Sequence, residues 1–137
     1  MRIAVIGAGT MGGRYAARIA SGEFGADLEL AGVADLDLDR AEAVARPTGA
    51  PAFDSAEELL ESIRPDAVYI ATPDAHHRNP ALAAAAARIP FLLEKPLATT
   101  VADAQAIADA AHAARVVAEV NFSNRWSPPF IAAKQSI

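Results

Sequence analysis

The stretch Phe91-Leu92-Leu93-Glu94-Lys95-Pro96 ends an apolar run with an acid, a base and a proline. Its first three residues are typical of a buried parallel strand. A charged pair at the tip of such a strand costs desolvation energy unless it has a function there. Glu94 and Lys95 are therefore candidate functional residues. The alternative is that they form a solvated ion pair at a sheet edge.

A glycine-rich segment, Gly7-Ala8-Gly9-Thr10-Met11-Gly12, follows the apolar run Ile3-Ala4-Val5-Ile6. In this G-x-G-x-x-G pattern Gly7 permits a tight turn, Gly9 lets the backbone approach a pyrophosphate, and Gly12 lets the following helix pack closely on the strand. Amide groups at the start of that helix then face the anion. Glycines also occur in simple turns, but their position between a strand and a helix predicts a dinucleotide site.

An acidic residue, Asp35, follows the second apolar run, roughly 20 residues past the last of these glycines. Its carboxylate can accept hydrogen bonds from the adenosine ribose hydroxyls and repel a 2′-phosphate, which favours NAD over NADP. Arg40 could instead hold such a phosphate, so NADP stays open. We count both residues as cofactor-binding.

The segment Asp35-Leu36-Asp37-Leu38-Asp39 allows a calcium loop as a second interpretation. Such a loop needs glycine at its sixth position and glutamate at its twelfth, where this sequence has Arg40 and Arg46. We therefore expect no calcium. Asp37 and Asp39 are predicted to be turn and helix-start residues.

A third apolar run is followed by Ala71-Thr72-Pro73 and, after Asp74, by a pair of histidines. Such a turn suits a strand-end loop beside a bound ligand. Adjacent histidines on a helix point about 100° apart and no third ligand is near, so we expect no metal. His77 is predicted to organise the loop or contact the cofactor. His76 and His112 are predicted to be partly exposed helix residues.

Short apolar runs alternate with alanine-rich helical segments along the chain. The predicted strands are residues 3–6, 28–34, 67–70, 91–93 and 116–122. The predicted helices are residues 11–21, 39–46, 56–63, a segment that contains Pro80 and ends at 88, and 100–114. Ser55 and Glu58 form a capping box for the third helix. The alternation predicts an α/β fold: a doubly wound parallel sheet of the Rossmann type, in three αβα layers and a single domain.

Composition excludes several function classes. The 137 residues carry a net charge of −5, which offers no electrostatic footprint for nucleic acid or an anionic membrane. Cysteine is absent, which excludes disulfides, thiolate metal sites and cysteine nucleophiles. No apolar run is long enough for a signal peptide or a membrane span. We expect a cytoplasmic protein without nucleic-acid or membrane partners.

These strand ends together resemble the N-terminal domain of the Gfo/Idh/MocA oxidoreductases, the glucose–fructose oxidoreductase and inositol dehydrogenase family. The resemblance is carried by the glycine-rich segment, by Ala71-Thr72-Pro73 with His77, and most specifically by Glu94-Lys95-Pro96. Asn124-Arg125-Trp126 with Pro128 resembles the segment that leads out of that family's nucleotide domain. The resemblance covers essentially the whole chain.

The resemblance implies an NAD(P)-dependent dehydrogenase that transfers a hydride between a nicotinamide and a sugar or cyclic polyol. In the family the lysine of this motif lies beside the nicotinamide and the reacting hydroxyl, which makes Lys95 the expected catalytic residue. Glu94 is expected to position Lys95 or to contact the nicotinamide ribose. The Lys95–Pro96 bond is expected to be cis. The set of cofactor-binding residues is completed by Asn121, Arg125 and Trp126.

The family also carries a second domain that forms the other wall of the substrate pocket, and this sequence does not contain it. We expect residues 1–126 to form the dinucleotide-binding domain. Residues 127–137 are expected to begin a connecting helix to the absent C-terminal substrate domain. This chain alone should then be inactive, and its uncovered apolar surface could support a homo-oligomer.

Two other functions fit the same glycine-rich turn. A non-catalytic dinucleotide-binding module, as a redox sensor or a subunit, would share the cofactor site without turnover. An S-adenosylmethionine methyltransferase would share the glycine-rich turn and the following acid, but it leaves Glu94-Lys95-Pro96 unexplained. Competition between NADH and S-adenosylmethionine tests that third interpretation.

Overall fold

Six parallel strands form one sheet in the order β3-β2-β1-β4-β5-β6 in the computed structural model, which describes residues 1–136. The strands are β1 (Arg2–Ile6), β2 (Glu29–Ala34), β3 (Ala52–Phe53), β4 (Ala67–Ile70), β5 (Phe91–Glu94) and β6 (Ala118–Asn121). Strand order reverses between β1 and β4, which are neighbours at the centre. Ligands of such sheets bind at this switch point, beyond the carboxyl ends of the strands. The predicted doubly wound Rossmann fold is confirmed.

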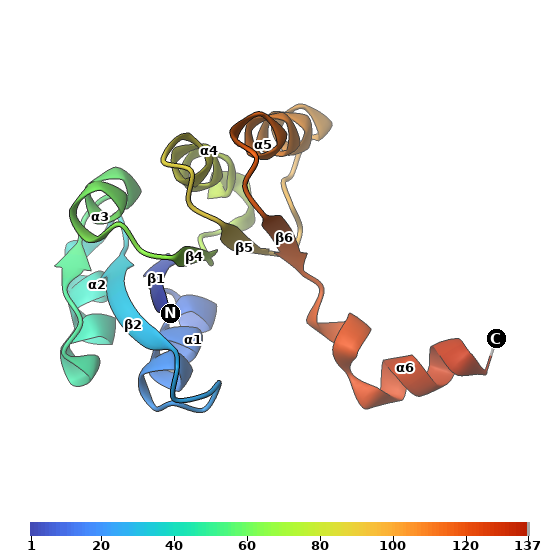
Figure 1. Ribbon diagram of the computed structural model, residues 1–137, viewed down its shortest axis with the longest axis horizontal. Helices are drawn as coiled ribbons and strands as arrows, with labels where there is room; N and C mark the ends of the chain where they lie inside the picture. Colours follow the sequence, from blue (N-terminus) through green and yellow to red (C-terminus); the bar gives the residue numbers. More distant parts are fainter. Residues whose placement is uncertain (137) are drawn as a thin grey trace.

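Helices cover both faces of the sheet and make it the middle of three layers (Figure 1). One face carries α1 (Thr10–Ala20) and α2 (Leu38–Ala45), and the other carries α3 (Ala56–Ile63), α4 (Arg78–Ala86) and α5 (Val101–Ala114). A sixth helix, α6 (Pro128–Gln135), extends away from the sheet. Within residues 1–136, none of the helices has the length and apolar character that crossing a membrane requires.

The central strands are buried on both faces because successive side chains point to opposite sides. Val68 and Ile70 of β4 pack with Leu93 in the cluster beneath α3, α4 and α5. Tyr69 points the other way and packs with Val5 in the cluster beneath α1 and α2. The carboxyl ends of β4 and β5 are therefore packed against side chains on both faces of the sheet.

Side-chain caps set the start of three helices near the carboxyl edge of the sheet. The Asp37 carboxylate accepts from the Arg40 amide at the start of α2, and the Ser55 hydroxyl accepts from the Glu58 amide at the start of α3. Thr100 accepts likewise from the amide of Asp103 at the start of α5. Each cap contributes roughly 1 kcal/mol. The predicted helix-start role of Asp37 is confirmed, and so is the Ser55 half of the capping box.

The structure differs from the sequence-based elements in short segments. β3 has two residues, too few to show a period, and it pairs with Val33 and Ala34 at the sheet edge. Short 3₁₀ turns, Arg46–Thr48, Asp74–His76 and Ser123–Trp126, were also not predicted. β6 is shorter than the predicted strand. The domain boundary placed after residue 126 stays a prediction, two residues before α6 begins at Pro128.

Candidate functional site

The glycine-rich loop joins β1 to α1, and its glycines meet different steric conditions. Gly7 has a φ of +99°, and a Cβ there would lie 2.6 Å from backbone atoms of Ala71 and Thr72. A Cβ at Gly12 would lie 1.7 Å from the carbonyl oxygen of Gly7, whereas a Cβ at Gly9 would meet nothing within 4 Å. The fold therefore requires glycine at Gly7 and Gly12. At Gly9 the space over the backbone is open, as close approach of a ligand requires.

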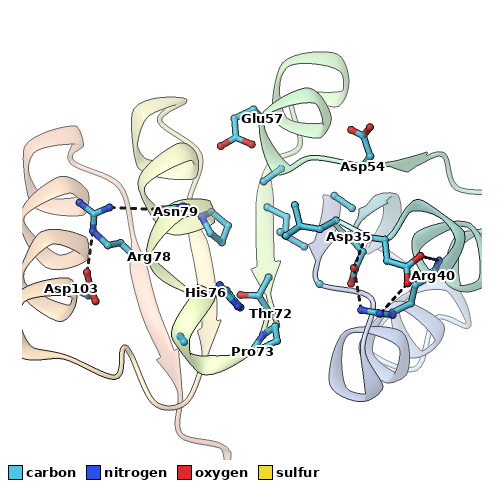
Figure 2. A pocket seen from close by; sticks show the side chains of 18 residues that line it. Asp35, Arg40, Asp54, Glu57, Thr72, Pro73, His76, Arg78, Asn79 and Asp103 are labelled. Atoms are coloured by element: carbon cyan, nitrogen blue, oxygen red, sulfur yellow. Dashed lines mark hydrogen bonds and ion pairs between the residues drawn. The ribbon is translucent and has the colours of Figure 1, made fainter.

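A pocket of about 590 Å³ lies at the switch point beside this loop (Figure 2). Five predicted site residues line it: Gly7, Asp35, Arg40, Thr72 and Pro73. The Thr72 hydroxyl oxygen is buried without a hydrogen-bond partner among the residues that the structure describes. Buried polar groups in native proteins are nearly always paired. A buried hydroxyl without a partner in the lining of this pocket fits a polar ligand such as a dinucleotide.

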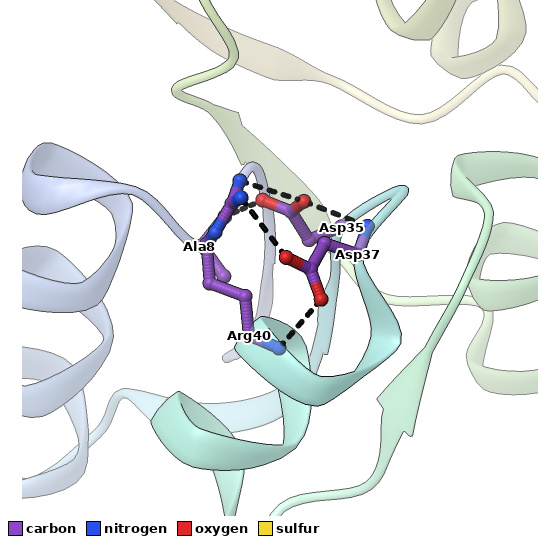
Figure 3. A network of polar contacts seen from close by, with 4 residues as sticks. All are labelled: Ala8, Asp35, Asp37 and Arg40. Carbon is purple, nitrogen blue, oxygen red and sulfur yellow. Dashed lines mark hydrogen bonds and ion pairs between the residues drawn. The ribbon is translucent and has the colours of Figure 1, made fainter.

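The carboxylate of Asp35 ties the glycine-rich loop to the start of α2 (Figure 3). Its Oδ2 accepts from the Ala8 amide at 2.7 Å, and its Oδ1 accepts from the Asp37 amide at 3.0 Å. Arg40 donates from Nη1 to the same Oδ1 at 3.2 Å and from Nη2 to Oδ2 of Asp37 at 3.0 Å. The side chain of Asp35 is only 12% exposed. Three donors thus hold the Asp35 carboxylate in the lining of the pocket.

Acidic side chains dominate the charge of this pocket (Figure 2). Both guanidinium groups of its lining are in ion pairs, Arg40 with Asp35 and Asp37, and Arg78 with Asp103 at 3.2 Å. Five carboxylates against two guanidinium groups leave a formal charge of −3. The lining carboxylates are those of Asp35, Asp37, Asp54, Glu57 and Asp103.

Glu94, at the end of β5, is buried and its carboxylate is held by neighbouring strands. Its Oε1 accepts from the Tyr69 hydroxyl and, at 2.7 Å, from the Asn121 side-chain amide. Its Oε2 accepts from the Lys95 backbone amide at 3.2 Å. The Asn121 amide also lies 3.4 Å from the hydroxyl of Tyr15 on α1. Glu94 therefore belongs to a buried network across β4, β5 and β6, which differs from a solvated ion pair at an edge.

Lys95 follows this network and is exposed at the same edge of the sheet. It lines a smaller pocket, of about 250 Å³, together with Asn121 and Arg125. The Lys95–Pro96 peptide bond is cis, as predicted. Trp126 belongs to the same 3₁₀ turn as Arg125 but is 80% exposed and outside the lining of this pocket. The structure thus places Lys95, Asn121 and Arg125 in one pocket, and Trp126 lies outside its lining.

His77 connects the loops that follow β4 and β5. The residue is fully buried, with Nδ1 2.8 Å from the carbonyl oxygen of Pro96 and Nε2 2.9 Å from that of Thr72. Both ring nitrogens therefore face backbone, which suits the loop-organising role. His76 and His112 are exposed. In the described part of the chain, no three His, Asp or Glu side chains gather as a metal-ligand set.

Tyr69 of the Glu94 network gives a testable pH dependence. Burial raises its pKa far above the usual value near 10, and the hydrogen bond to Glu94 raises it further. From about pH 10 the unfolded chain loses this proton while the folded chain keeps it, so the stability contribution is complete below that pH and falls above it. Above that pH, Tyr69 alone lowers the free energy of unfolding by about 1.4 kcal/mol per pH unit. In urea unfolding from about pH 9 to about pH 11, the free energy of unfolding should fall less steeply in Tyr69→Phe than in the unmodified chain. Equal slopes would contradict this contribution.

The sequence-based search missed Tyr69 and Tyr15. Tyr69 lies within the apolar strand Ala67-Val68-Tyr69-Ile70, and the apolar pattern does not distinguish it from the other buried residues of that strand. The available signal was its hydroxyl, because a buried tyrosine usually finds a hydrogen-bond partner. Such a partner had to come from a neighbouring strand on the same face, as Glu94 does.

The doubly wound sheet and the glycine-rich loop that joins β1 to α1 together define a dinucleotide-binding Rossmann domain. The chain belongs to the Gfo/Idh/MocA family, since residues 1–122 match the family described as "Oxidoreductase family, NAD-binding Rossmann fold". The resemblance stated from the sequence is confirmed.

Similar proteins include dehydrogenases of polyols and sugars. Inositol 2-dehydrogenase of Rubrobacter xylanophilus is 36% identical over 136 residues, which cover 98% of this chain and 39% of that protein. The structure of myo-inositol dehydrogenase from Lactobacillus casei in complex with NAD(H) and myo-inositol matches with a TM-score of 0.89 and 29% identity, over 99% of this chain and 40% of that one. UDP-N-acetylglucosamine 3-dehydrogenase from Acidithiobacillus ferrooxidans matches with a TM-score of 0.86 and 32% identity, over 99% and 43%. This chain spans about two fifths of the length of the curated relatives it matches.

Proposed function

We propose that this chain is the cofactor-binding part of an NAD-dependent dehydrogenase that oxidises a cyclic polyol or sugar. The observation that carries the proposal is the order of the strand ends. Asp35 follows β2, Gly7 follows β1, Thr72 lies just past β4, and Lys95 follows β5, so the four lie in sequence along one edge of the sheet. Such an edge offers an acid for ribose, a glycine loop for pyrophosphate and a lysine for the reacting end.

Asp35 and the glycine-rich loop bind the adenosine half in this proposal. The carboxylate accepts from the ribose hydroxyls, and the backbone at Gly9 approaches the pyrophosphate. The orphaned Thr72 hydroxyl donates to the same ligand, which supplies the partner that it lacks among the described residues. The pocket's formal charge of −3 supports NAD over NADP, because a 2′-phosphate would add charge of the same sign.

Lys95 acts on the substrate in this proposal. Bound NAD would supply the hydride acceptor. Lys95 orients the reacting hydroxyl and takes up its proton at Nζ, while Glu94 fixes the backbone from which Lys95 projects. This step needs the side chain of Lys95 as the neutral amine. Asn121 and Arg125 line the same pocket as Lys95. The substrate class comes from relatives named as inositol 2-dehydrogenases. The remaining substrate contacts are assigned to a C-terminal domain, to which residues 127–137 would connect.

Isothermal titration of the purified chain with NADH, NADPH and S-adenosylmethionine tests cofactor binding. We expect saturable NADH binding, about tenfold tighter than NADPH, and no competition by S-adenosylmethionine. Asp35→Ser should reduce the ratio of the Kd for NADPH to the Kd for NADH to less than about threefold, because it removes the carboxylate that would repel a 2′-phosphate. The matched variant Asp54→Ser removes a lining acid without a hydrogen bond to the glycine-rich loop and should keep most of the preference. A preference that survives Asp35→Ser would remove Asp35 from the proposal, and failure of NADH to bind the unmodified chain would refute the cofactor assignment.

A further inference from the structure

Arg40 is held on two sides by carboxylates at the adenosine end of the pocket (Figure 3). Its Nη1 lies 3.2 Å from Oδ1 of Asp35, and its Nη2 lies 3.0 Å from Oδ2 of Asp37. Each carboxylate therefore holds a different nitrogen of the same planar group. Two such contacts fix the direction of a guanidinium more closely than one does.

Asp37 can keep its ion pair with Arg40 while ribose hydroxyls donate hydrogen bonds to Asp35. Ribose hydroxyls would compete with Arg40 for the oxygens of Asp35. The contact between Asp37 and Nη2 uses neither that carboxylate nor that nitrogen, so the competition leaves it intact. Asp37 is itself anchored, since its Oδ1 accepts from the Arg40 amide at 3.3 Å where it caps α2.

A 2′-phosphate on the adenosine ribose would need a cation from this lining. The guanidinium of Arg78 is paired with Asp103, on the side of the pocket formed by α4 and α5 (Figure 2). Arg40 lies on the Asp35 side, where the phosphate would sit, and it is already engaged. NADPH would therefore have to break the pair between Arg40 and Asp37 or bind without a cation.

We propose that Asp37 is a positioning residue for cofactor choice: it keeps the Arg40 guanidinium in an internal ion pair and so unavailable to a 2′-phosphate. The inference rests on the proposed function and extends its selectivity from Asp35 to a second carboxylate. The sequence pattern assigned Asp37 only to the start of a helix. The structure adds a contact that the helix cap does not need, because the cap uses Oδ1 and the ion pair uses Oδ2.

Asp37→Asn separates these two roles. Asparagine is as good a helix cap as aspartate, and it has nearly the same size without the charge. We expect the Kd for NADPH to fall about fivefold and the Kd for NADH to stay within about twofold, the scale of releasing one exposed ion pair. Isothermal titration with both cofactors measures the ratio, and urea unfolding confirms that the cap is kept. Asp37→Ser is the second variant should the first not fold, since serine is also a good cap.

The same substitution in an Arg40→Gln background shows whether Asp37 acts through Arg40. With no guanidinium to release, Asp37→Asn should change the Kd for NADPH by less than about twofold. Asp54→Asn in the unmodified chain removes a charge from the same pocket without touching Arg40, and it should have an equally small effect. A fivefold gain from Asp54→Asn, or from Asp37→Asn without Arg40, would mean that general charge sets the preference and would overturn the inference.

The outcomes distinguish this inference from the function on which it rests. An unmodified chain that binds NADH, with an unchanged NADH to NADPH ratio in Asp37→Asn, overturns the role of Asp37 and leaves the cofactor assignment intact. An unmodified chain that binds neither cofactor overturns both. A shifted ratio that depends on Arg40 supports both.

Discussion

Gly9→Ala is expected to weaken NADH binding by at least about tenfold while changing the free energy of unfolding by less than about 1 kcal/mol. Gly9 is the residue before α1, with φ −70° and ψ −168°, a conformation that alanine adopts readily. A Cβ there meets no other atom of the chain within 4 Å, so the folded state tolerates it. The same methyl group would stand where we place the pyrophosphate. Isothermal titration and urea unfolding measure the two effects separately.

Gly12→Ala should destabilise the fold, in contrast to Gly9→Ala, although both residues belong to the same motif. Its Cβ would lie 1.7 Å from the carbonyl oxygen of Gly7, so α1 would have to move off β1. We expect a loss of about 3 kcal/mol or more in the free energy of unfolding, with NADH binding lost as a consequence. Gly13→Ala is the matched control, because its Cβ would have a side-chain methyl of Val44 as its nearest contact, at 3.3 Å, and would lie 4.0 Å from the closest backbone atom, the carbonyl oxygen of Ala8. If Gly12→Ala unfolded at the same urea concentration as Gly13→Ala, the steric account of this glycine would be wrong.

Much of the fold could be predicted because its signals are local. The apolar runs that became β1, β2, β4 and β5 alternate with helical patterns, and this alternation alone gives a parallel sheet with helices on both faces. Once the sheet is parallel, residues that follow different strands must share one edge. Gly7, Asp35, Thr72 and Lys95 were placed together by that rule.

The contacts within the site could not be predicted because they depend on which face and which loop a side chain meets. Glu94 was recognised as a charged residue after a buried strand, but spacing does not reveal that Tyr69 and Asn121 point to the same face. Asp37 looked like a helix cap, and only its geometry separates the oxygen that caps from the oxygen that holds Arg40. Tertiary contacts of this kind follow from the packing of strands, which a local pattern does not contain.

Glu94→Ala is expected to destabilise the folded chain by about 3 kcal/mol. The substitution removes the acceptor from the Tyr69 hydroxyl and the Asn121 amide, and it leaves the backbone amide of Lys95 with one partner fewer. Unsatisfied donors in a buried site lose their interaction with water without gaining a replacement. Urea unfolding measures the loss. Glu119→Ala, at an exposed position of the neighbouring strand β6, should change stability by less than about 0.5 kcal/mol.

The network account of Glu94 also predicts how this substitution combines with Tyr69→Phe. If Tyr69 stabilises the fold mainly by donating to Glu94, its hydroxyl has little left to contribute once Glu94 is alanine, so the double variant should lose less than the sum of the two single losses. Strict additivity would mean that the two side chains act independently and that Glu94 is held by other groups. Glu94→Gln keeps an acceptor oxygen for the Tyr69 hydroxyl and the Asn121 amide, which share Oε1, but its amide nitrogen cannot accept from the Lys95 backbone amide. In urea unfolding it should therefore destabilise the chain less than Glu94→Ala does.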